Sequence, residues 1–155
     1  MKIALVSDIH YAKREFERVL PIINTCDYFV FCGDGLTNVN ALRYELTVPA
    51  VCVKGNCDFE YGAETASAFF GGVKAIVTHG HKYGAKSGLS GLVALAASQN
   101  SNLVLFGHTH IPCDKTENGV RLINPGALMD GCFAIVNVFD NMAEHITVER
   151  LTVPK

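Results

Sequence analysis

Residues 3–10, Ile-Ala-Leu-Val-Ser-Asp-Ile-His, decide the fold that this sequence predicts. The first four residues are uninterruptedly apolar, as in a β-strand that is covered on both faces. Two residues able to bind metals, Asp8 and His10, follow directly. In open α/β sheets, ligands bind beyond the carboxyl ends of the strands. The stretch therefore predicts an α/β protein with a functional site at the end of its first strand.

The rest of the chain alternates strands and helices before it changes character. Further strands are expected at residues 28–32, 50–53, 75–78, 103–106, 120–123, 132–139 and 145–153. Helices are expected over residues 16–23, with Pro21 as a kink or restart, over 39–46, near 63–70, and from Ser87, as an N-cap, to Ala96. Turns are expected at 117–119 and 140–141. This order predicts a single α/β domain over residues 1–155, with room for two packed sheets and outer helices.

Composition excludes several classes of protein. Hydrophobic residues make up 49% of the 155 residues and charged residues 18%, enough for a core and against disorder. The longest apolar runs have strand length, too short for a membrane helix, and the apolar run near the start is too short for a signal peptide. We therefore expect a cytoplasmic protein that spans no membrane.

The charge pattern argues against two classes of binding partner. The net charge is −2 and the basic residues are scattered, which argues against a nucleic-acid or anionic-membrane surface. A small phosphate ester remains compatible, because bound cations can supply positive charge that composition does not show. Whether the chain forms a homo-oligomer is left open.

The six cysteines are interpreted as reduced, buried thiols. Cys32, Cys52 and Cys132 lie within apolar runs, and no C-x-x-C pair occurs. With no export signal, a disulfide framework is the weaker interpretation.

Polar residues with metal-binding side chains follow five of the expected strands. The motifs are Asp8-Ile9-His10, Gly33-Asp34, Gly55-Asn56-Cys57-Asp58, His79-Gly80-His81 and Gly107-His108-Thr109-His110. Singly, most of them are ordinary helix caps or turns. Together they would bury many charged and imidazole groups, which is unfavourable unless they bind something. The mixture of carboxylate, imidazole and amide favours Mn, Fe, Zn or Co over Mg or Ca.

This ordered set resembles the calcineurin-like metallophosphoesterase superfamily. Gly55-Asn56-Cys57-Asp58, Thr78-His79-Gly80-His81 and Asn124-Pro125-Gly126 are similar to its small bacterial and archaeal phosphodiesterase branch, which also resembles the eukaryotic retromer subunit Vps29. The resemblance implies an α/β fold of four layers, an α-β-β-α sandwich of two mixed sheets flanked by helices.

The resemblance also implies a binuclear metal site. One ion would be bound by Asp8, His10, Asp34 and His110, and the second by Asp34, Asn56, His79 and His108. Manganese is the expected metal, with zinc, iron, nickel or cobalt as alternatives. The implied reaction is hydrolysis of a phosphodiester by in-line attack of a hydroxide held between the two ions, with Asp8, Asp34, Asn56, His79 and His108 as catalytic residues.

One position departs from the family pattern. Many members carry a histidine directly after the Gly-Asn pair, where this chain has Cys57. A thiol is a poor substitute for an imidazole acid, so we expect Cys57 to be a buried filler. The leaving group would take its proton from His81, Asp58 or water, or need none.

Other assignments concern the surroundings of the site. His81 or Lys82 is expected to contact substrate, and Cys57 and Asp58 stay candidates for the same role. Ser7 and Asn124 are expected to orient metal ligands. His145 is assigned to a strand face without a function.

Two alternative functions remain open at the level of sequence. One is phosphomonoester or nucleotide hydrolysis. The other is a Vps29-like protein-binding scaffold with a vestigial metal site, against which the complete ligand set argues.

Overall fold

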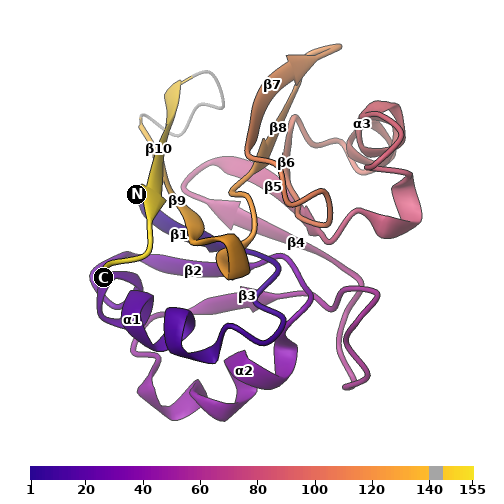
Figure 1. The fold of residues 1–155 in the computed structure, drawn as a ribbon. Helices are drawn as coiled ribbons and strands as arrows, with labels where there is room; N and C mark the ends of the chain where they lie inside the picture. Colours follow the sequence, from indigo (N-terminus) through magenta and orange to yellow (C-terminus); the bar gives the residue numbers. More distant parts are fainter. Residues whose placement is uncertain (140–144) are drawn as a thin grey trace.

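The computed structural model describes residues 1–139 and 145–155, which form two five-stranded β-sheets with helices outside them (Figure 1). The first sheet contains β1 (Lys2–Val6), β2 (Tyr28–Phe31), β3 (Ala50–Cys52), β9 (Cys132–Val138) and β10 (Ile146–Thr152). The second contains β4 (Thr65–Phe70), β5 (Val73–Thr78), β6 (Leu103–Leu105), β7 (Cys113–Glu117) and β8 (Val120–Asn124). The helices are α1 (Lys13–Ile23), α2 (Leu36–Ala41) and α3 (Ser90–Ser98).

Both sheets are mixed. The first has the order β10-β9-β1-β2-β3, and its strands β1, β2 and β3 run parallel. The second has the order β4-β5-β6-β8-β7, with β5, β6 and β8 parallel. The remaining strands pair antiparallel at the sides. Each sheet therefore collects the carboxyl ends of three parallel strands at one edge.

Three hydrophobic clusters hold the layers together. One lies between the sheets, and the other two lie under the helices: α1 and α2 pack on the first sheet, and α3 packs on the second. Strand β1 contributes to two of them, because Ile3 and Leu5 face the second sheet while Ala4 and Val6 face α1. A strand covered on both faces needs apolar residues at every position. The expected four-layer α-β-β-α sandwich is thereby confirmed.

One predicted helix is wrong. Residues 63–70, expected to be helical, contain instead the strand β4, which pairs antiparallel with β5 from Thr65↔Thr78 to Phe70↔Val73. The alanines of this segment suggested a helix, but Ala66 and Ala68 alternate with outward residues and pack against the inter-sheet cluster. Pairing and burial override the weak helix propensity of a six-residue segment.

Helix boundaries differ from the expectation at several points. Ser87 is not an N-cap, because α3 begins at Ser90 without a side-chain cap. The helix expected over 39–46 is divided into α2 and a 3₁₀ turn at Arg43–Glu45. Pro21 stays inside α1, where it falls in the last turn and α1 ends at Ile23. The exact ends of helices depend on tertiary contacts, which hydrophobic periodicity in the sequence does not reveal.

The predictions for the turns and the cysteines are confirmed only in part. The expected turn at 117–119 joins β7, a strand that was not predicted, to β8, and the turn expected at 140–141 lies outside the described residues. All six cysteines are free, as expected, but only Cys26 and Cys32 are buried. Within the described ranges, no helix has the length and apolar character needed to cross a membrane.

Arg121 on β8 connects the two sheets. Its Nη1 donates to the Ile146 carbonyl oxygen of β10 at 2.6 Å, and its Nε and Nη2 donate to the two carboxylate oxygens of Asp114 on β7 at 2.9 and 3.0 Å. The guanidinium is half-buried. The forked, charge-assisted contact with Asp114 fixes the guanidinium within the second sheet, and its bond to Ile146 links it to the first.

Replacing Arg121 by Met should lower the free energy of unfolding by about 1–3 kcal/mol, because charge-assisted hydrogen bonds are lost at a half-buried position. Urea unfolding followed by circular dichroism measures this loss. Arg18→Met, at an exposed position of α1, is the control and should change stability by less than about 0.5 kcal/mol. Equal losses in both variants would show that Arg121 does not connect the sheets.

Candidate metal centre

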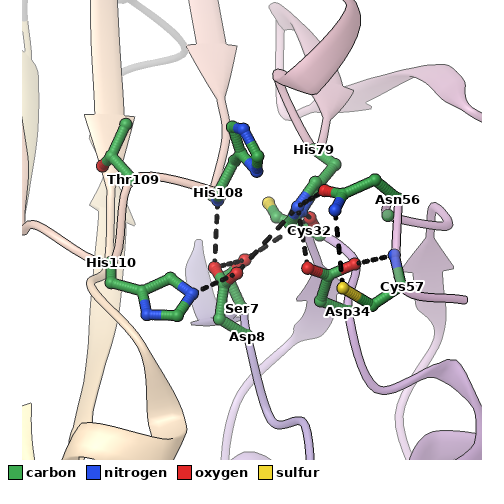
Figure 2. A network of polar contacts seen from close by, with 12 residues as sticks. Ser7, Asp8, Cys32, Asp34, Asn56, Cys57, His79, His108, Thr109 and His110 are labelled. Carbon is green, nitrogen blue, oxygen red and sulfur yellow. Dashed lines mark hydrogen bonds and ion pairs between the residues drawn. The ribbon is translucent and has the colours of Figure 1, made fainter. Parts of the chain in front are cut away.

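The seven predicted ligands lie together at the edge where the carboxyl ends of both sheets meet. Figure 2 labels all of them except His10, and the loops that carry them follow five different strands. Asp8 and His10 follow β1, Asp34 follows β2, Asn56 follows β3, His79 follows β5, and His108 and His110 follow β6. The parallel strands therefore place side chains from distant parts of the sequence in one crevice.

The first group of ligand atoms surrounds Asp8. Its Oδ1 lies 3.1 Å from His110 Nε2 and 3.7 Å from His10 Nε2, and the two nitrogens are 3.3 Å apart. Two nitrogens that bind one ion at 2.0–2.1 Å lie about 3.0–3.4 Å from each other in octahedral or tetrahedral geometry. The spacing fits a single ion held by these three residues.

The second group is centred on His79. Its Nε2 lies 3.2 Å from Asp34 Oδ2 and 3.1 Å from Asn56 Oδ1. His108 joins this group: Asp34, His79 and His108 each offer a ligand atom within 4.8 Å of the others. Asp34 Oδ2 is also 3.8 Å from His10 Nε2 of the first group. Asp34 thus lies between the groups, at the position that a bridging carboxylate would take.

Among the described residues, one oxygen of Asp8 has no hydrogen-bond donor. Asp8 is fully buried, and Oδ2 accepts from Ser7 Oγ at 2.6 Å and from the His108 N–H at 3.0 Å. Oδ1 is buried and forms no hydrogen bond, although His110 Nε2 is near. Leaving a buried carboxylate oxygen without a partner is unfavourable. A cation at this point would satisfy Oδ1 and the histidine nitrogens that face it.

His79 is held in the tautomer that suits a metal ligand. Its Nδ1–H donates to the Cys32 carbonyl oxygen at 2.7 Å. When the ring is neutral, the proton on Nδ1 leaves Nε2 as the atom able to bind a metal, and Nε2 lies beside Asp34 and Asn56. A backbone carbonyl on the far nitrogen is the usual means of orienting a metal-binding histidine.

The electrostatics of the crevice keep two of the predicted ligands unprotonated. Burial raises the pKa of Asp8, more than the nearby His79 and Ser7 lower it. Burial alone would raise the pKa of Asp34, but the hydrogen bond and charge of His79 bring it well below its usual range. Burial and the charge of His79 lower the pKa of His108 to about 4. At neutral pH, Asp34 and His108 are therefore unprotonated and able to act as ligands.

Backbone strain is concentrated at the same residues. Five of the seven predicted ligands have positive φ angles: 54° at Asp8, 47° at His10, 61° at Asp34, 68° at His108 and 61° at His110. Each residue other than glycine in this region costs about 1–3 kcal/mol and persists only where the surroundings enforce it. Strain that recurs at the ligand positions indicates a functional constraint.

Two glycines allow the loops to approach closely. A Cβ at Gly55 would lie 2.0 Å from Asp34 Oδ1, and one at Gly107 would lie 1.8 Å from Ser7 Oγ. No side chain fits at either position unless the carboxylates move. The glycines in the Gly-Asn and Gly-His motifs are therefore required by packing against the two acidic ligands.

Ser7 contacts a predicted ligand directly, and Asn124 contacts the loop that carries two of them. Ser7 bonds to Asp8, as described above. Asn124 Nδ2 donates to the Gly107 carbonyl oxygen at 2.8 Å and to Thr109 Oγ1 at 3.1 Å, which fixes the loop that carries His108. Asn38 has a similar role that the sequence did not suggest: its Nδ2 donates to the His10 carbonyl oxygen at 2.9 Å. No motif marks Asn38, because its spacing from His10 depends on how α2 packs.

Cys57 and Asp58 differ in their surroundings. The expectation that Cys57 is buried is wrong, since the residue is exposed while its N–H donates to Asp34 Oδ1 at 2.8 Å. Asp58 is buried, and its carboxylate accepts from the backbone N–H groups of Asp34, Gly35, Leu36 and Gly55 at 2.8–2.9 Å. Asp58 therefore fixes two ligand loops, and its oxygens are not available as a proton source or substrate contact.

His81 lies closer to the ligands than Lys82 does. The ring centroid of His81 is 5.4 Å from that of His79 and 6.1 Å from that of His108. Its Nδ1 is buried without a hydrogen-bond partner in the described structure. Lys82 forms an exposed ion pair with Glu64. Of the two candidates for substrate contact, His81 has the better position.

Sequence comparisons agree with this geometry. The calcineurin-like phosphoesterase superfamily domain matches residues 1–140. A probable metallophosphoesterase of Bacillus subtilis, YsnB, is 30% identical over 83% of this chain and 75% of its own length. The phosphodiesterase YfcE of Escherichia coli is 26% identical over 83% of this chain and 79% of its own length.

Solved structures share the fold. A predicted phosphoesterase of Streptococcus pneumoniae superposes with a TM-score of 0.84 at 26% identity, over 97% of this chain and 88% of that chain. Vps29 of Entamoeba histolytica in complex with zinc has a TM-score of 0.71 at 20% identity, over 99% of this chain and 100% of that chain, and is similar in fold alone. The matching domain, together with the ligand geometry at the sheet edges, shows that this chain belongs to the calcineurin-like phosphoesterase superfamily.

Proposed function

We propose that this chain is a phosphodiesterase that uses two divalent metal ions to hydrolyse a small phosphate ester. The observation that carries the proposal is the pair of ligand groups that share Asp34, with the unpartnered buried Oδ1 of Asp8 in one of them. Asp8, His10, Asp34 and His110 would hold one ion, and Asp34, Asn56, His79 and His108 the other. When bound, the ions would supply nucleophile activation and neutralise phosphoryl charge.

The residues of the chain would bind and orient the phosphoryl group. Asp34 fixes the spacing of the two ion positions, because its backbone and carboxylate are tied to the loops of Asp58 and Cys57. Rigid positioning and electrostatic stabilisation account for most catalysis of phosphoryl transfer. His81, beside His79 and His108, is the residue placed to contact a phosphoryl oxygen or the leaving group.

Two observations favour a diester over a monoester substrate. A monoester carries one more negative charge at neutral pH, and the nearby Lys82, which could offset it, is paired with Glu64. The relative YfcE is named a phosphodiesterase. The donor set of carboxylate, imidazole and amide suits manganese, with zinc, iron, nickel or cobalt as alternatives. We place the enzyme in the cytoplasm.

Hydrolysis of bis-(p-nitrophenyl) phosphate tests the proposal directly. Protein supplied with Mn²⁺ should release p-nitrophenolate from the diester faster than from p-nitrophenyl phosphate. A chelator should abolish the release, because the ligands alone supply no activated nucleophile. Faster hydrolysis of the monoester would favour a phosphomonoesterase. If neither compound turned over with any of these metals, the scaffold function would be the better account.

Asp34→Asn should reduce kcat for the diester by about a hundredfold or more, a barrier increase of roughly 2.7 kcal/mol, because one carboxylate serves both ion positions. The bound metal per chain, measured by elemental analysis after gel filtration, should fall as well. Glu17→Gln makes the same chemical change at an exposed position of α1 and should change neither quantity. Near-normal turnover with Asp34→Asn would contradict the assignment.

Cys57→Ala should change kcat for the diester by less than about threefold. p-Nitrophenolate leaves without a proton, and the exposed thiol, whose pKa is raised by partial loss of hydration and by Asp34, is protonated at neutral pH. Cys132→Ala is the control for loss of a thiol elsewhere. A hundredfold loss in the Cys57 variant alone would show that the thiol takes part in the reaction.

A further inference from the structure

A cavity of about 420 Å³ opens beside the metal centre. His10 and Asp34 of the centre form one part of its lining, Thr37 and Asn38 of α2 form another, and Tyr11 and Phe59 belong to it as well. Its volume lies within the range of small-molecule sites. Because it shares two residues with the centre, a phosphoryl group held there would direct one of its ester groups into this cavity.

The two aromatic residues are almost fully exposed. Tyr11 is 99% and Phe59 is 96% exposed, and neither belongs to a hydrophobic cluster. A buried aromatic ring removes about 150–250 Å² of surface from water, and aromatic pairs gain further through stacking. Tyr11 and Phe59 both remain exposed to water and both line the same cavity. Their rings are therefore available to stack on a ligand.

The backbone that carries both rings is fixed. Tyr11 directly follows His10, whose N–H donates to the Asp34 carbonyl oxygen at 2.9 Å. Phe59 directly follows Asp58, whose buried carboxylate accepts four backbone N–H groups. Binding a ligand against these rings would therefore order little additional backbone, which reduces the entropic cost of association.

The polar side of the cavity offers hydrogen-bonding groups. Asn38 uses one Nδ2 hydrogen on the His10 carbonyl oxygen, which leaves the other hydrogen to donate and allows Oδ1 to accept. Thr37 is bonded to Glu60. Stacking surfaces with an amide beside them suit a flat ring that carries heteroatoms better than they suit an alkyl chain.

We propose that this cavity binds a planar aromatic ester group of the substrate, an aryl ring or a nucleobase, through Tyr11 and Phe59. The inference rests on the proposed function and specifies its substrate class. Tyr11 and Phe59 are then specificity residues, which take no part in the chemical step.

The test is a binding measurement by isothermal titration calorimetry with the Mn²⁺-loaded protein. Phenyl phosphate is compared with ethyl phosphate, and adenosine 5′-phosphate with ribose 5-phosphate. Stacking on two rings should make the aromatic compound of at least one pair bind about tenfold more tightly or better. Preference within the first pair alone identifies an aryl group, and preference within the second identifies a nucleobase.

Variants at Tyr11 and Phe59 test whether these two rings cause the preference for the aromatic compounds. In the double variant Tyr11→Ala and Phe59→Ala the preference should fall to within about twofold, whereas Tyr11→Phe with Phe59→Tyr should retain it because stacking needs only the ring. Tyr44→Ala is the matched control, since Tyr44 is also 99% exposed but does not line the cavity. Both exposed positions tolerate substitution, and thermal unfolding verifies that each variant is folded.

The outcomes separate this inference from the proposed function. Equal binding within both pairs would overturn the aromatic cavity and leave the phosphodiesterase in place. A preference that survives the double alanine variant would also overturn it, as would a change of oligomeric state in that variant with the preference intact. Failure of all four phosphate monoesters to bind would overturn this inference, whereas the proposed diesterase would be overturned only if bis-(p-nitrophenyl) phosphate also failed to turn over.

Discussion

The structure depends on the confinement of two carboxylates, Asp8 and Asp34, at the edge where two sheets meet. Both side chains are buried, and each has an oxygen directed at histidine nitrogens within 4 Å. Buried negative charge is unfavourable unless positive charge or hydrogen bonds compensate it. Serine, histidine and backbone donors supply part of that compensation. The arrangement of the remaining ligand atoms suits divalent cations.

The fold creates this confinement through the parallel strands within each of its two sheets. Strands β1, β2 and β3 end at one edge of the first sheet, and β5 and β6 end beside them in the second. Packing of the sheets therefore sets the distance between His79 and Asp34, residues that are far apart in sequence. Positive φ angles at the ligands and the close approach at Gly55 and Gly107 show that the loops are compressed around the carboxylates. The stability of the apolar layers sustains this local strain.

The surroundings of the centre differ in rigidity and chemistry. Asp58 joins two loops through its carboxylate, so the inner wall of the site is fixed by hydrogen bonds. The outer wall is different, because Tyr11, Cys57 and Phe59 are directed to solvent. A fixed centre with an exposed, partly aromatic rim suits an enzyme that holds the phosphoryl group firmly and recognises its substituent by contact. The fold places the centre, and exposed side chains form its rim.

Local sequence determined the features that depend on short-range patterns. Apolar runs such as Ile3–Val6 identified strands covered on both faces, and the motifs after them identified all seven residues that converge at the sheet edge. Tertiary structure decided what depends on contacts between distant segments. It made residues 65–70 a strand by pairing them with β5, turned Cys57 outward through its bond to Asp34, and brought Asn38 to His10. The reason is physical: hydrophobic period and motif spacing are carried by neighbouring residues, whereas pairing, burial and loop contacts exist only after the chain has packed.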